Sequence, residues 1–368
     1  MNSTKLCEYI INLTNDSIIK QNRDGSMPAG HNGPWNNIDT PVRNTAHWAI
    51  TFCEIYKLTK DNRFLEAAFK AAEYLLSKQA RPGGVAYLCR IDENKNFSNG
   101  LIGQAWAIES LSLLYKCLGI EKCRIVAEEV FISHPFNYKL GLWNAIDIYG
   151  EPLPVHRTYN QQLWFALSGI LLLSSGINNE LIKERVGIYL SNLVQHTYLE
   201  KDGVINHRIW FTDKHADLKR KIKGTLTDIS LRLDKNYSEI SAGYHSFNLY
   251  AYGMIKKYYS GYVSFFDSNI FRQVKSNCLN NNYLSLLNTN KFAFKYNPTG
   301  FEIAYFCEMF ELNKNGNEIM AKDLLEKQLC FYNDKIVSSN IDYDTLFARI
   351  YEATRLNEFN LQYINGES

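Results

Sequence analysis

Residues Gln21 to Trp48, QNRDGSMPAGHNGPWNNIDTPVRNTAHW, form a polar loop that passes directly into an apolar helix. Gly and Pro punctuate the loop, and a helix is predicted from about residue 43 onward. Hydrogen-bonding, titratable and aromatic side chains gather near the junction, namely His31, Asn32, Trp35, Asp39, Arg43, Asn44, His47 and Trp48. Loops of this composition on a rigid scaffold often carry binding and catalytic groups. The stretch therefore predicts one wall of a site at a helix N-terminus.

The same alternation of a long polar loop and an apolar helix recurs along the chain. Helices that are apolar on all sides are predicted at residues 43–59, 100–119, 157–175, 244–259, 300–312 and 343–355. Amphipathic helices are predicted between them, at residues 3–20, 63–78, 121–132, 179–198, 267–280 and 318–332. Two concentric rings require this pattern, because inner helices contact neighbours on every side and outer helices on one face. The loops contain no strand-like run long enough for an α/β fold.

These patterns predict an all-α fold, an (α/α)6 barrel of twelve helices in an inner and an outer ring, with residues 1–368 as a single domain. The formal net charge is only +2, and no basic run is long enough to follow a nucleic-acid backbone. No segment has the length of a membrane span, and the N-terminus does not resemble a signal peptide. The eight Cys contain no CxxC pair, which indicates reduced thiols. We expect a soluble cytoplasmic protein without a nucleic-acid partner, and the sequence leaves its oligomeric state open.

In a barrel of this kind, the long loops lie at one end and lead into the N-termini of the inner helices. Free N–H groups and the positive ends of the helix dipoles favour a binding site there. Beyond the first stretch, the substrate-binding residues predicted at these helix starts are Asn99, Gln104, Trp106, Arg157, Tyr159, Asn160, Gln161, Trp164 and Tyr244. Indole rings suit stacking on sugars, although each could instead fill the core, and arginines suit carboxylates. Arg43 and Arg157 are predicted to hold the carboxylate of an acidic saccharide.

Five titratable side chains in or near these loops and helix starts are candidates for general acid or base catalysis: Asp39, Asp147, Glu239, His245 and Glu302. Structural roles are open to three of them. Asp39 could cap a helix, and His245 could be a core histidine with satisfied hydrogen bonds. Glu302 lies in an apolar helix, where Arg349 or Arg43 could neutralise it. No metal or other cofactor is predicted, because the chain lacks HExxH, a Gly-rich phosphate loop and a Ser nucleophile elbow.

Two resemblances to known proteins point to glycans. Gly103-Gln104-Ala105-Trp106-Ala107-Ile108 resembles the Gly-Gln-Ala-Trp helix of the unsaturated glucuronyl hydrolases, which are (α/α)6 barrels, and Asp39-Thr40 with Asn44 is similar to their Asp-led helix mouths. This resemblance implies metal-free hydration of a 4,5-unsaturated uronic acid, in which an aspartate protonates the double bond and activates water. The family's second catalytic aspartate has no evident counterpart unless Asp147 or Glu239 replaces it.

The second resemblance covers most of the chain. The segments GHNGPW, TPVRNTAHW, NGLIGQAW, SHPFNYKLGLW and NPTGFEIAY resemble uncharacterised proteins encoded with surface-polysaccharide and glycan-assembly genes. This resemblance supplies a glycan context and no chemistry. The charged segment at residues 213–223 is more typical of a solvated helix than of a lid over a cavity.

The sequence thus predicts a carbohydrate-active enzyme, with a glycoside hydrolase acting on a uronic-acid-containing or otherwise acidic glycan as the first hypothesis. A polysaccharide lyase or a sugar epimerase on the same fold is the alternative, and His245 or a Tyr should then face Arg43 across the cavity. A non-catalytic glycan-binding protein of polysaccharide assembly is the third hypothesis. It predicts an aromatic-lined groove without a carboxylate of perturbed pKa.

Overall fold

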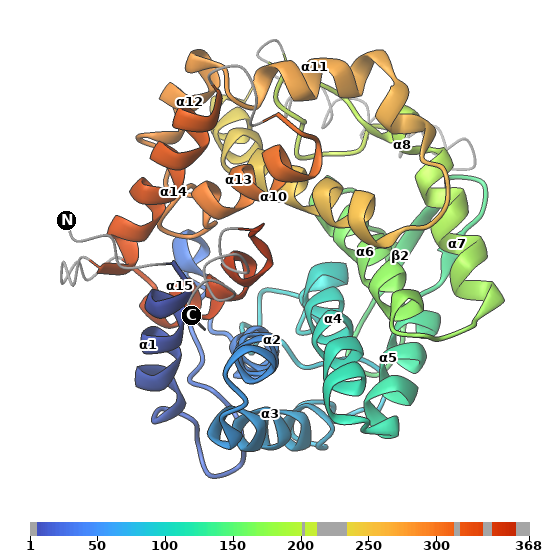
Figure 1. The fold of residues 1–368 in the computed structure, drawn as a ribbon. Helices are drawn as coiled ribbons and strands as arrows, with labels where there is room; N and C mark the ends of the chain where they lie inside the picture. Colours follow the sequence, from blue (N-terminus) through green and yellow to red (C-terminus); the bar gives the residue numbers. More distant parts are fainter. Residues whose placement is uncertain (1–5, 201–202, 212–233, 313–316, 334–340, 358–368) are drawn as a thin grey trace.

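Two rings of helices build the chain in a computed structural model that describes residues 6–200, 203–211, 234–312, 317–333 and 341–357 (Figure 1). The inner ring consists of α2 (Val42–Thr59), α4 (Gly100–Leu118), α6 (Tyr159–Ser174), α10 (Lys235–Tyr258), α13 (Thr299–Met309) and α15 (Tyr343–Ala348), which continues as the 3-10 helix η3 (Arg349–Arg355). Contacts run from α2 through α4, α6, α10 and α13 to η3, which contacts α2 again. The ring therefore closes, and the predicted (α/α)6 barrel is confirmed.

The outer ring consists of α1 (Leu6–Ile18), α3 (Asn62–Leu75), α5 (Glu121–Ser133), α7 (Glu180–Ser191) with α8 (Leu193–His196), α11 (Asn269–Asn277) with α12 (Asn281–Leu287), and α14 (Asn317–Asn333). Two features differ from the prediction. The helix predicted at residues 179–198 is interrupted at Asn192, and α10 begins at Lys235, well before residue 244. The segment at residues 213–223 lies outside the described residues.

Burial separates the two rings as the sequence pattern predicted. Every residue of α4 from Gly100 to Ser112 is buried, because neighbouring helices surround it. The amphipathic α3 buries Phe64, Ala68 and Ala72, and it leaves the opposite face to solvent. Inner helices therefore have few exposed positions, and their N-terminal turns and the loops before them must supply the polar groups of any site.

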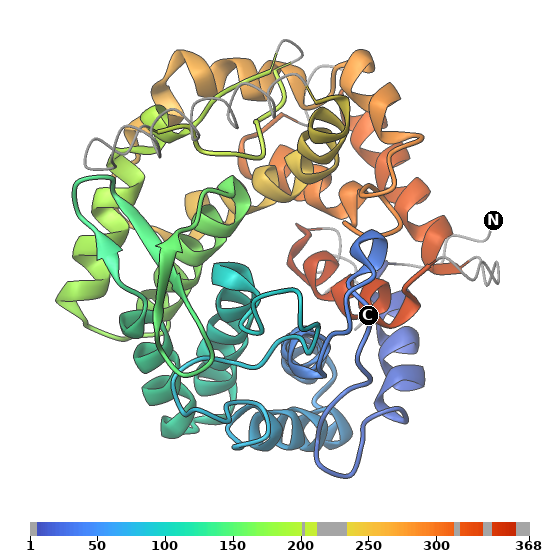
Figure 2. The same ribbon diagram turned by 180° about the vertical axis from the view of Figure 1, so that it is seen from behind.

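A small antiparallel sheet, which the sequence analysis did not predict, lies in the long loop before α6. It pairs β1 (Phe136–Asn137) with β2 (Leu142–Ile146), and β2 with β3 (Pro152–Val155). Trp143 of β2 is fully buried against Phe131 and Phe165, so this tryptophan fills the core. The sheet and the long loops before α2 and α4 lie on the near side of the barrel in Figure 2. These three loops thus share one end of the barrel, as expected.

Two further features bear on the sequence predictions. Among the described helices, none has the combined length and apolar character that crossing a membrane requires. All eight cysteines have free thiols, and all but Cys117 and Cys330 are buried.

Candidate functional site

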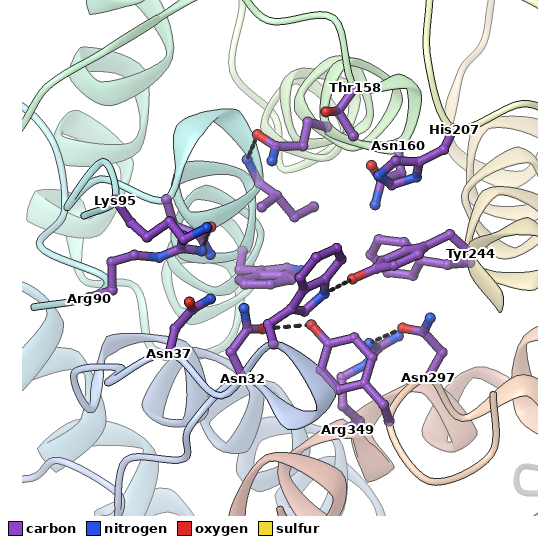
Figure 3. A pocket seen from close by; sticks show the side chains of 17 residues that line it. Asn32, Asn37, Arg90, Lys95, Thr158, Asn160, His207, Tyr244, Asn297 and Arg349 are labelled. Carbon is purple, nitrogen blue, oxygen red and sulfur yellow. Dashed lines mark hydrogen bonds between the residues drawn. The ribbon is translucent and has the colours of Figure 1, made fainter. Parts of the chain in front are cut away.

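A cavity of about 220 Å³ lies at the end of the barrel where the inner helices begin (Figure 3). Its aromatic and apolar lining consists of Trp35, Trp106, Tyr244, Phe247, Tyr296 and Ile102. Its polar lining consists of Asn32, Asn37, Asn99, Asn160, Gln161, Asn297, Thr158, His207, Arg90, Lys95 and Arg349. Within the described part of the chain, no Asp or Glu lines it. The cavity is therefore polar, aromatic and cationic.

The loop before α2 forms one wall of this cavity and is fastened to the start of α15. Asp342 Oδ2 accepts the backbone N–H groups of His31 at 2.8 Å and Gly33 at 3.0 Å. Gly33 has a φ of 53°, and a Cβ there would meet the ring of Tyr296 at 2.3 Å. Only glycine fits both the backbone conformation and the space. Asp342 thus fixes the loop before α2 to the start of α15.

Arg43 lies beneath the cavity, where it supports lining residues without lining the cavity itself. Its guanidinium donates to Asn32 Oδ1 at 2.7 Å and lies 4.4 Å from the centre of the Trp106 ring. The Tyr296 hydroxyl donates to the same Asn32 oxygen at 2.6 Å. Arg43 is only 2% exposed, and its guanidinium holds Trp106 and Asn32 in place.

Trp35 and Tyr244 form the outer aromatic part of the lining. Trp35 Nε1 donates to the Tyr244 hydroxyl at 2.8 Å, and the indole remains 39% exposed. Burial raises the pKa of Tyr244 well above its ordinary value, so the phenol is neutral near pH 7. An exposed indole fixed by a hydrogen bond is a ready platform for a sugar ring.

His207 faces the cavity beside Tyr244, with the two ring centres 4.9 Å apart. Its backbone is fixed, because its N–H donates to Ser241 Oγ and its carbonyl accepts from Tyr159 N–H. The ring Nδ1 has no hydrogen-bond partner among the described residues. Burial, with a smaller contribution from His156, lowers the pKa of His207 to about 3. The imidazole is therefore neutral and can accept a proton.

Positive charge gathers at the other side of the cavity. Arg90 and Lys95 lie next to each other there, across from His207 and Asn160 (Figure 3). Arg90 donates to Asn99 Oδ1, and Asn99 immediately precedes α4. The N-terminus of a long helix adds a positive dipole end to the two cations. This side of the cavity is suited to a carboxylate or another anion.

Asp39 lies near the cationic side but does not line the cavity. Its backbone pairs with that of Arg90, and its Oδ2 lies 3.8 Å from Arg43 Nη1. Burial raises the pKa of Asp39 to about 6, although Arg43 and Arg90 oppose the rise. Its Oδ1 has no hydrogen-bond partner in the described part of the chain. The raised pKa of Asp39 suits a general acid, but the side chain does not line the cavity.

Glu302 is fully buried below the cavity in an ionic cluster. Its Oε1 lies 2.7 Å from Arg349 Nη2, and its Oε2 accepts from the Ser246 hydroxyl at 2.5 Å. Arg349 Nη2 also lies 2.6 Å from Glu352 Oε1, so one guanidinium serves two carboxyl groups. Arg349 neutralises Glu302, as the structural alternative in the sequence analysis proposed, and Arg349 itself reaches the cavity.

The Glu302→Gln variant is expected to change how stability depends on pH. Burial and the nearby Glu352 raise the pKa of Glu302 from 4.5 to about 8, against the opposing charge of Arg349. Between these pH values the folded chain holds more protons at this position than the unfolded chain, so the unfolding free energy falls as pH rises. In urea unfolding from about pH 5 to about pH 8, the wild type should lose stability relative to Glu302→Gln. A difference that stays constant over this range would contradict the assigned pKa.

Seven of the predicted site residues line the cavity: Asn32, Trp35, Asn99, Trp106, Asn160, Gln161 and Tyr244. The other predicted site residues do not line it: His31, Asp39, Arg43, Asn44, His47, Trp48, Gln104, Arg157, Tyr159, Trp164, Glu239, His245 and Glu302. Most of these hold neighbouring structure. Gln104, for example, accepts Tyr87 N–H and donates to the Ser98 carbonyl, which fixes the preceding loop.

Similar structural contacts occupy the other predicted residues. His245 Nδ1 accepts Ile205 N–H at 3.1 Å, and burial lowers its pKa to about 3. Trp164 Nε1 donates to the Phe247 carbonyl, and the Tyr159 hydroxyl bonds Thr197 and Tyr252. The remaining contacts pair Asn44 with the Pro28 carbonyl, His47 with the rings of Trp106 and Tyr351, Trp48 with Phe52, Arg157 with Phe211, and the Glu239 carbonyl with Asn290. His31 remains 43% exposed in its side chain beside Asp342.

The sequence did not predict ten residues of the lining: Asn37, Arg90, Lys95, Ile102, Thr158, His207, Phe247, Tyr296, Asn297 and Arg349, the last of which was expected only as a partner of Glu302. Arg90 and Lys95 lie in the loop that leads into α4. The expectation that long loops supply the residues of the site therefore applies to both. A positively charged side chain in such a loop could therefore have been predicted to line the cavity. His207 lies in an irregular segment without periodicity, and the sequence alone gave no signal for it.

The fold and the site define an (α/α)6 barrel with an aromatic and cationic cavity at the N-terminal ends of its inner helices. No family model matches the chain. The chain is 34% identical over 373 residues to archaeal glycosylation protein Q of Haloferax volcanii, covering 97% of the chain and 99% of that protein. It belongs to the family of this glycosylation protein.

Solved structures share the fold at low sequence identity. Cellobiose 2-epimerase from Bacillus thermoamylovorans has a TM-score of 0.63 and 11% identity, with 97% of this chain and 100% of that chain covered. An inactive variant of an α-1,6-mannanase from Salegentibacter has a TM-score of 0.55 and 12% identity, with 97% and 99% covered. Identities this low establish the barrel fold and leave the chemistry to the residues of the site.

Proposed function

We propose that this chain is a carbohydrate-active enzyme that removes the proton next to the carboxylate of a uronic acid and thereby epimerises the sugar. The observation that carries the proposal is the lining of the cavity, which places Arg90 and Lys95 across from His207 and Tyr244. A glycosidase that uses two carboxyl groups needs both beside the scissile bond, and none lines the cavity among the described residues. Proton abstraction instead needs a base and positive charge.

Arg90 and Lys95 bind the uronate carboxylate in this proposal. A proton next to a free carboxylate is a very weak acid, because its removal leaves two negative charges on neighbouring atoms. Two cations and the N-terminus of α4 neutralise the carboxylate and stabilise the charge that develops in the transition state. Trp35 and Trp106 stack on the sugar, and Asn32 and Asn160 bind its hydroxyl groups.

His207 is the base. Its lowered pKa keeps the imidazole neutral, so a ring nitrogen has a free lone pair, although the pKa of about 3 makes it a weak base in the empty cavity. A bound uronate brings a negative charge into the cavity, which raises the pKa of His207 and makes it a stronger base when substrate is present. Inversion requires the proton to return from the opposite face of that carbon, and the Lys95 ammonium, across the cavity from His207, is the donor on that face. Tyr244 lies beside His207 with a neutral phenol, and it binds a sugar hydroxyl group on the side of the base.

The family supplies a glycan context, and the fold is shared by a sugar epimerase and by enzymes that cleave glycans. The Haloferax volcanii relative is named as a glycosylation protein. A cellobiose 2-epimerase is among the solved structures with this fold. These likenesses supply context, and the choice of His207 and Arg90 rests on the cavity.

Hydration of an unsaturated uronic acid is a second candidate, favoured by Asp39. A carboxyl group with a pKa near 6 can donate a proton at neutral pH, and Asp39 Oδ1 has no competing partner among the described residues. The Asp-led helix mouths of the unsaturated glucuronyl hydrolases resemble this position. The reaction would require substrate to reach past Arg90 to Asp39.

Incubation with acidic oligosaccharides, saturated and 4,5-unsaturated, separates the reactions. We expect a uronate epimer by chromatography, with no change in chain length or ultraviolet absorbance. A fall in absorbance would instead establish hydration, and a rise would establish elimination. New reducing ends would establish hydrolysis, and binding without any product would assign a glycan-binding protein. Each of these four results overturns epimerisation.

The Arg90→Ala variant tests the proposed binding of the uronate carboxylate by Arg90. A hydrogen bond to a charged group contributes about 1.5–3 kcal/mol, so KM for the uronate should rise about 10- to 100-fold. A neutral oligosaccharide that binds the same cavity should lose much less affinity. Arg63→Ala is the matched control, because Arg63 is exposed on α3 and does not line the cavity. Equal losses of affinity for acidic and neutral sugars would contradict the proposed binding of the carboxylate by Arg90.

A further inference from the structure

A second cavity, of about 250 Å³, lies at the opposite end of the barrel, where the inner helices end. The last turns of α2, α4, α6 and α10 and the end of η3 converge on it. Sites for drug-sized ligands measure about 300–1,000 Å³. Like the first cavity, the second therefore has room for one small ligand or for one terminal residue of a longer ligand.

The cationic side chains at this cavity differ in how they are paired. Lys57 lies 2.8 Å from Glu54, and Arg355 lies 2.6 Å from Glu109. Lys116 and Lys257 are exposed and have no carboxylate within ion-pair distance in the described part of the chain. Lysines at helix C-termini commonly complement the helix dipole. Lys257 Nζ lies 5.6 Å from the centre of the Tyr258 ring, which leaves its charge without an anionic partner. Two lysines without a carboxylate partner, on different helices around one cavity, also attract an anion.

Glu109 supplies a second, independent observation. It is only 2% exposed and lines the cavity, and its Oε2 has no hydrogen-bond partner among the described residues. A buried acceptor without a donor costs free energy. Nearby, the Ser112 hydroxyl donates to the Ile108 carbonyl at 2.7 Å, so its own oxygen remains free to accept. The cavity thus offers acceptors for hydroxyl groups as well as positive charge.

We propose that this second cavity binds a small acidic sugar. Its carboxylate or phosphate lies between Lys116 and Lys257, and one of its hydroxyl groups donates to Glu109 Oε2. An anion without a hydroxyl group, such as chloride or sulfate, cannot donate to Glu109, and a neutral sugar leaves the charge of the lysines without a partner. The proposal is independent of the reaction at the first cavity, because none of its residues lines that cavity.

Titration calorimetry on the full chain tests the proposal, with glucuronic acid, glucose 6-phosphate and glucose as probes. The titrations use the Arg90→Ala background, in which the first cavity is weakened. At least one of the two acids should bind to this background variant. Glucose should bind to it at least tenfold more weakly. Adding Lys116→Ala and Lys257→Ala should weaken acid binding at least tenfold. Both lysines are exposed on helix ends, so folding should be unaffected.

The matched control adds Lys122→Ala and Lys256→Ala to the same background, which removes equal charge from exposed positions outside the cavity. This control should bind the acids as the background does. The proposal is overturned if the control weakens binding as much as the cavity variant, or if glucose binds as well as the acids. Absence of acid binding in the background also overturns it. A failed epimerisation assay would leave each of these results unchanged, so the two proposals fail separately.

Discussion

The Arg349→Met variant is expected to lose about 3–5 kcal/mol of unfolding free energy, because it leaves buried carboxyl groups without their cation. Arg349 is 1% exposed and bonds both Glu302 and Glu352, which are fully buried. Its Nη1 also donates to Asn297 Oδ1 at 2.9 Å, which ties the loop before α13 to η3. Urea unfolding above about pH 8, where Glu302 is ionised, measures the loss.

A charge-free cluster should recover much of that stability. Adding Glu302→Gln and Glu352→Gln to Arg349→Met removes the uncompensated carboxyl groups, and buried ion clusters can often be replaced at little net cost. Arg63→Met, at the exposed ion pair with Asp61, is the control and should change stability little. A small loss for Arg349→Met, equal to that of the control, would show that the cluster does not hold η3 in the barrel.

The second large effect is expected at His207. Removing a general base typically lowers the rate about 10²- to 10⁴-fold, so His207→Gln should lose that much turnover on a uronate. Substrate binding should persist, because Arg90, Lys95 and the aromatic lining are unchanged. Turnover and calorimetric binding, measured on the same preparation, separate the two effects.

His31→Gln is the matched control for His207→Gln. His31 belongs to the loop before α2, and its side chain is 43% exposed and outside the cavity lining. We expect wild-type turnover from this variant. Full activity in His207→Gln would exclude His207 as the base and leave Tyr244 or Asp39 as the candidate for proton transfer.

The barrel could be predicted because burial on all sides leaves a mark in the sequence itself. The helix α4 is apolar around its whole circumference, whereas α3 carries one apolar stripe, and this contrast recurs around the ring. The sheet of β1, β2 and β3 escaped prediction because its strands are very short and lie within one loop. Their pairing depends on neighbours that periodicity does not report.

The site was harder to predict because side chains of one type in similar positions do different work. Gln104 and Gln161 both lie near the start of an inner helix. Gln104 is fully buried and holds the preceding loop, whereas Gln161 accepts Leu101 N–H and lines the cavity. Trp35 and Trp164 differ in the same way, since only Trp35 is exposed. Tertiary partners decide such roles, and spacing along the chain does not encode them.

The central claim is that the cavity removes a proton from the carbon next to a uronate carboxylate, and deuterium exchange tests it most directly. The protein is incubated with a uronate-containing oligosaccharide in D2O, and the hydrogen at that carbon is followed by NMR. We predict enzyme-dependent loss of its signal, with the glycosidic bonds intact and the loss abolished in His207→Gln. Retention of the hydrogen alongside a measurable chemical change elsewhere in the sugar would contradict the claim.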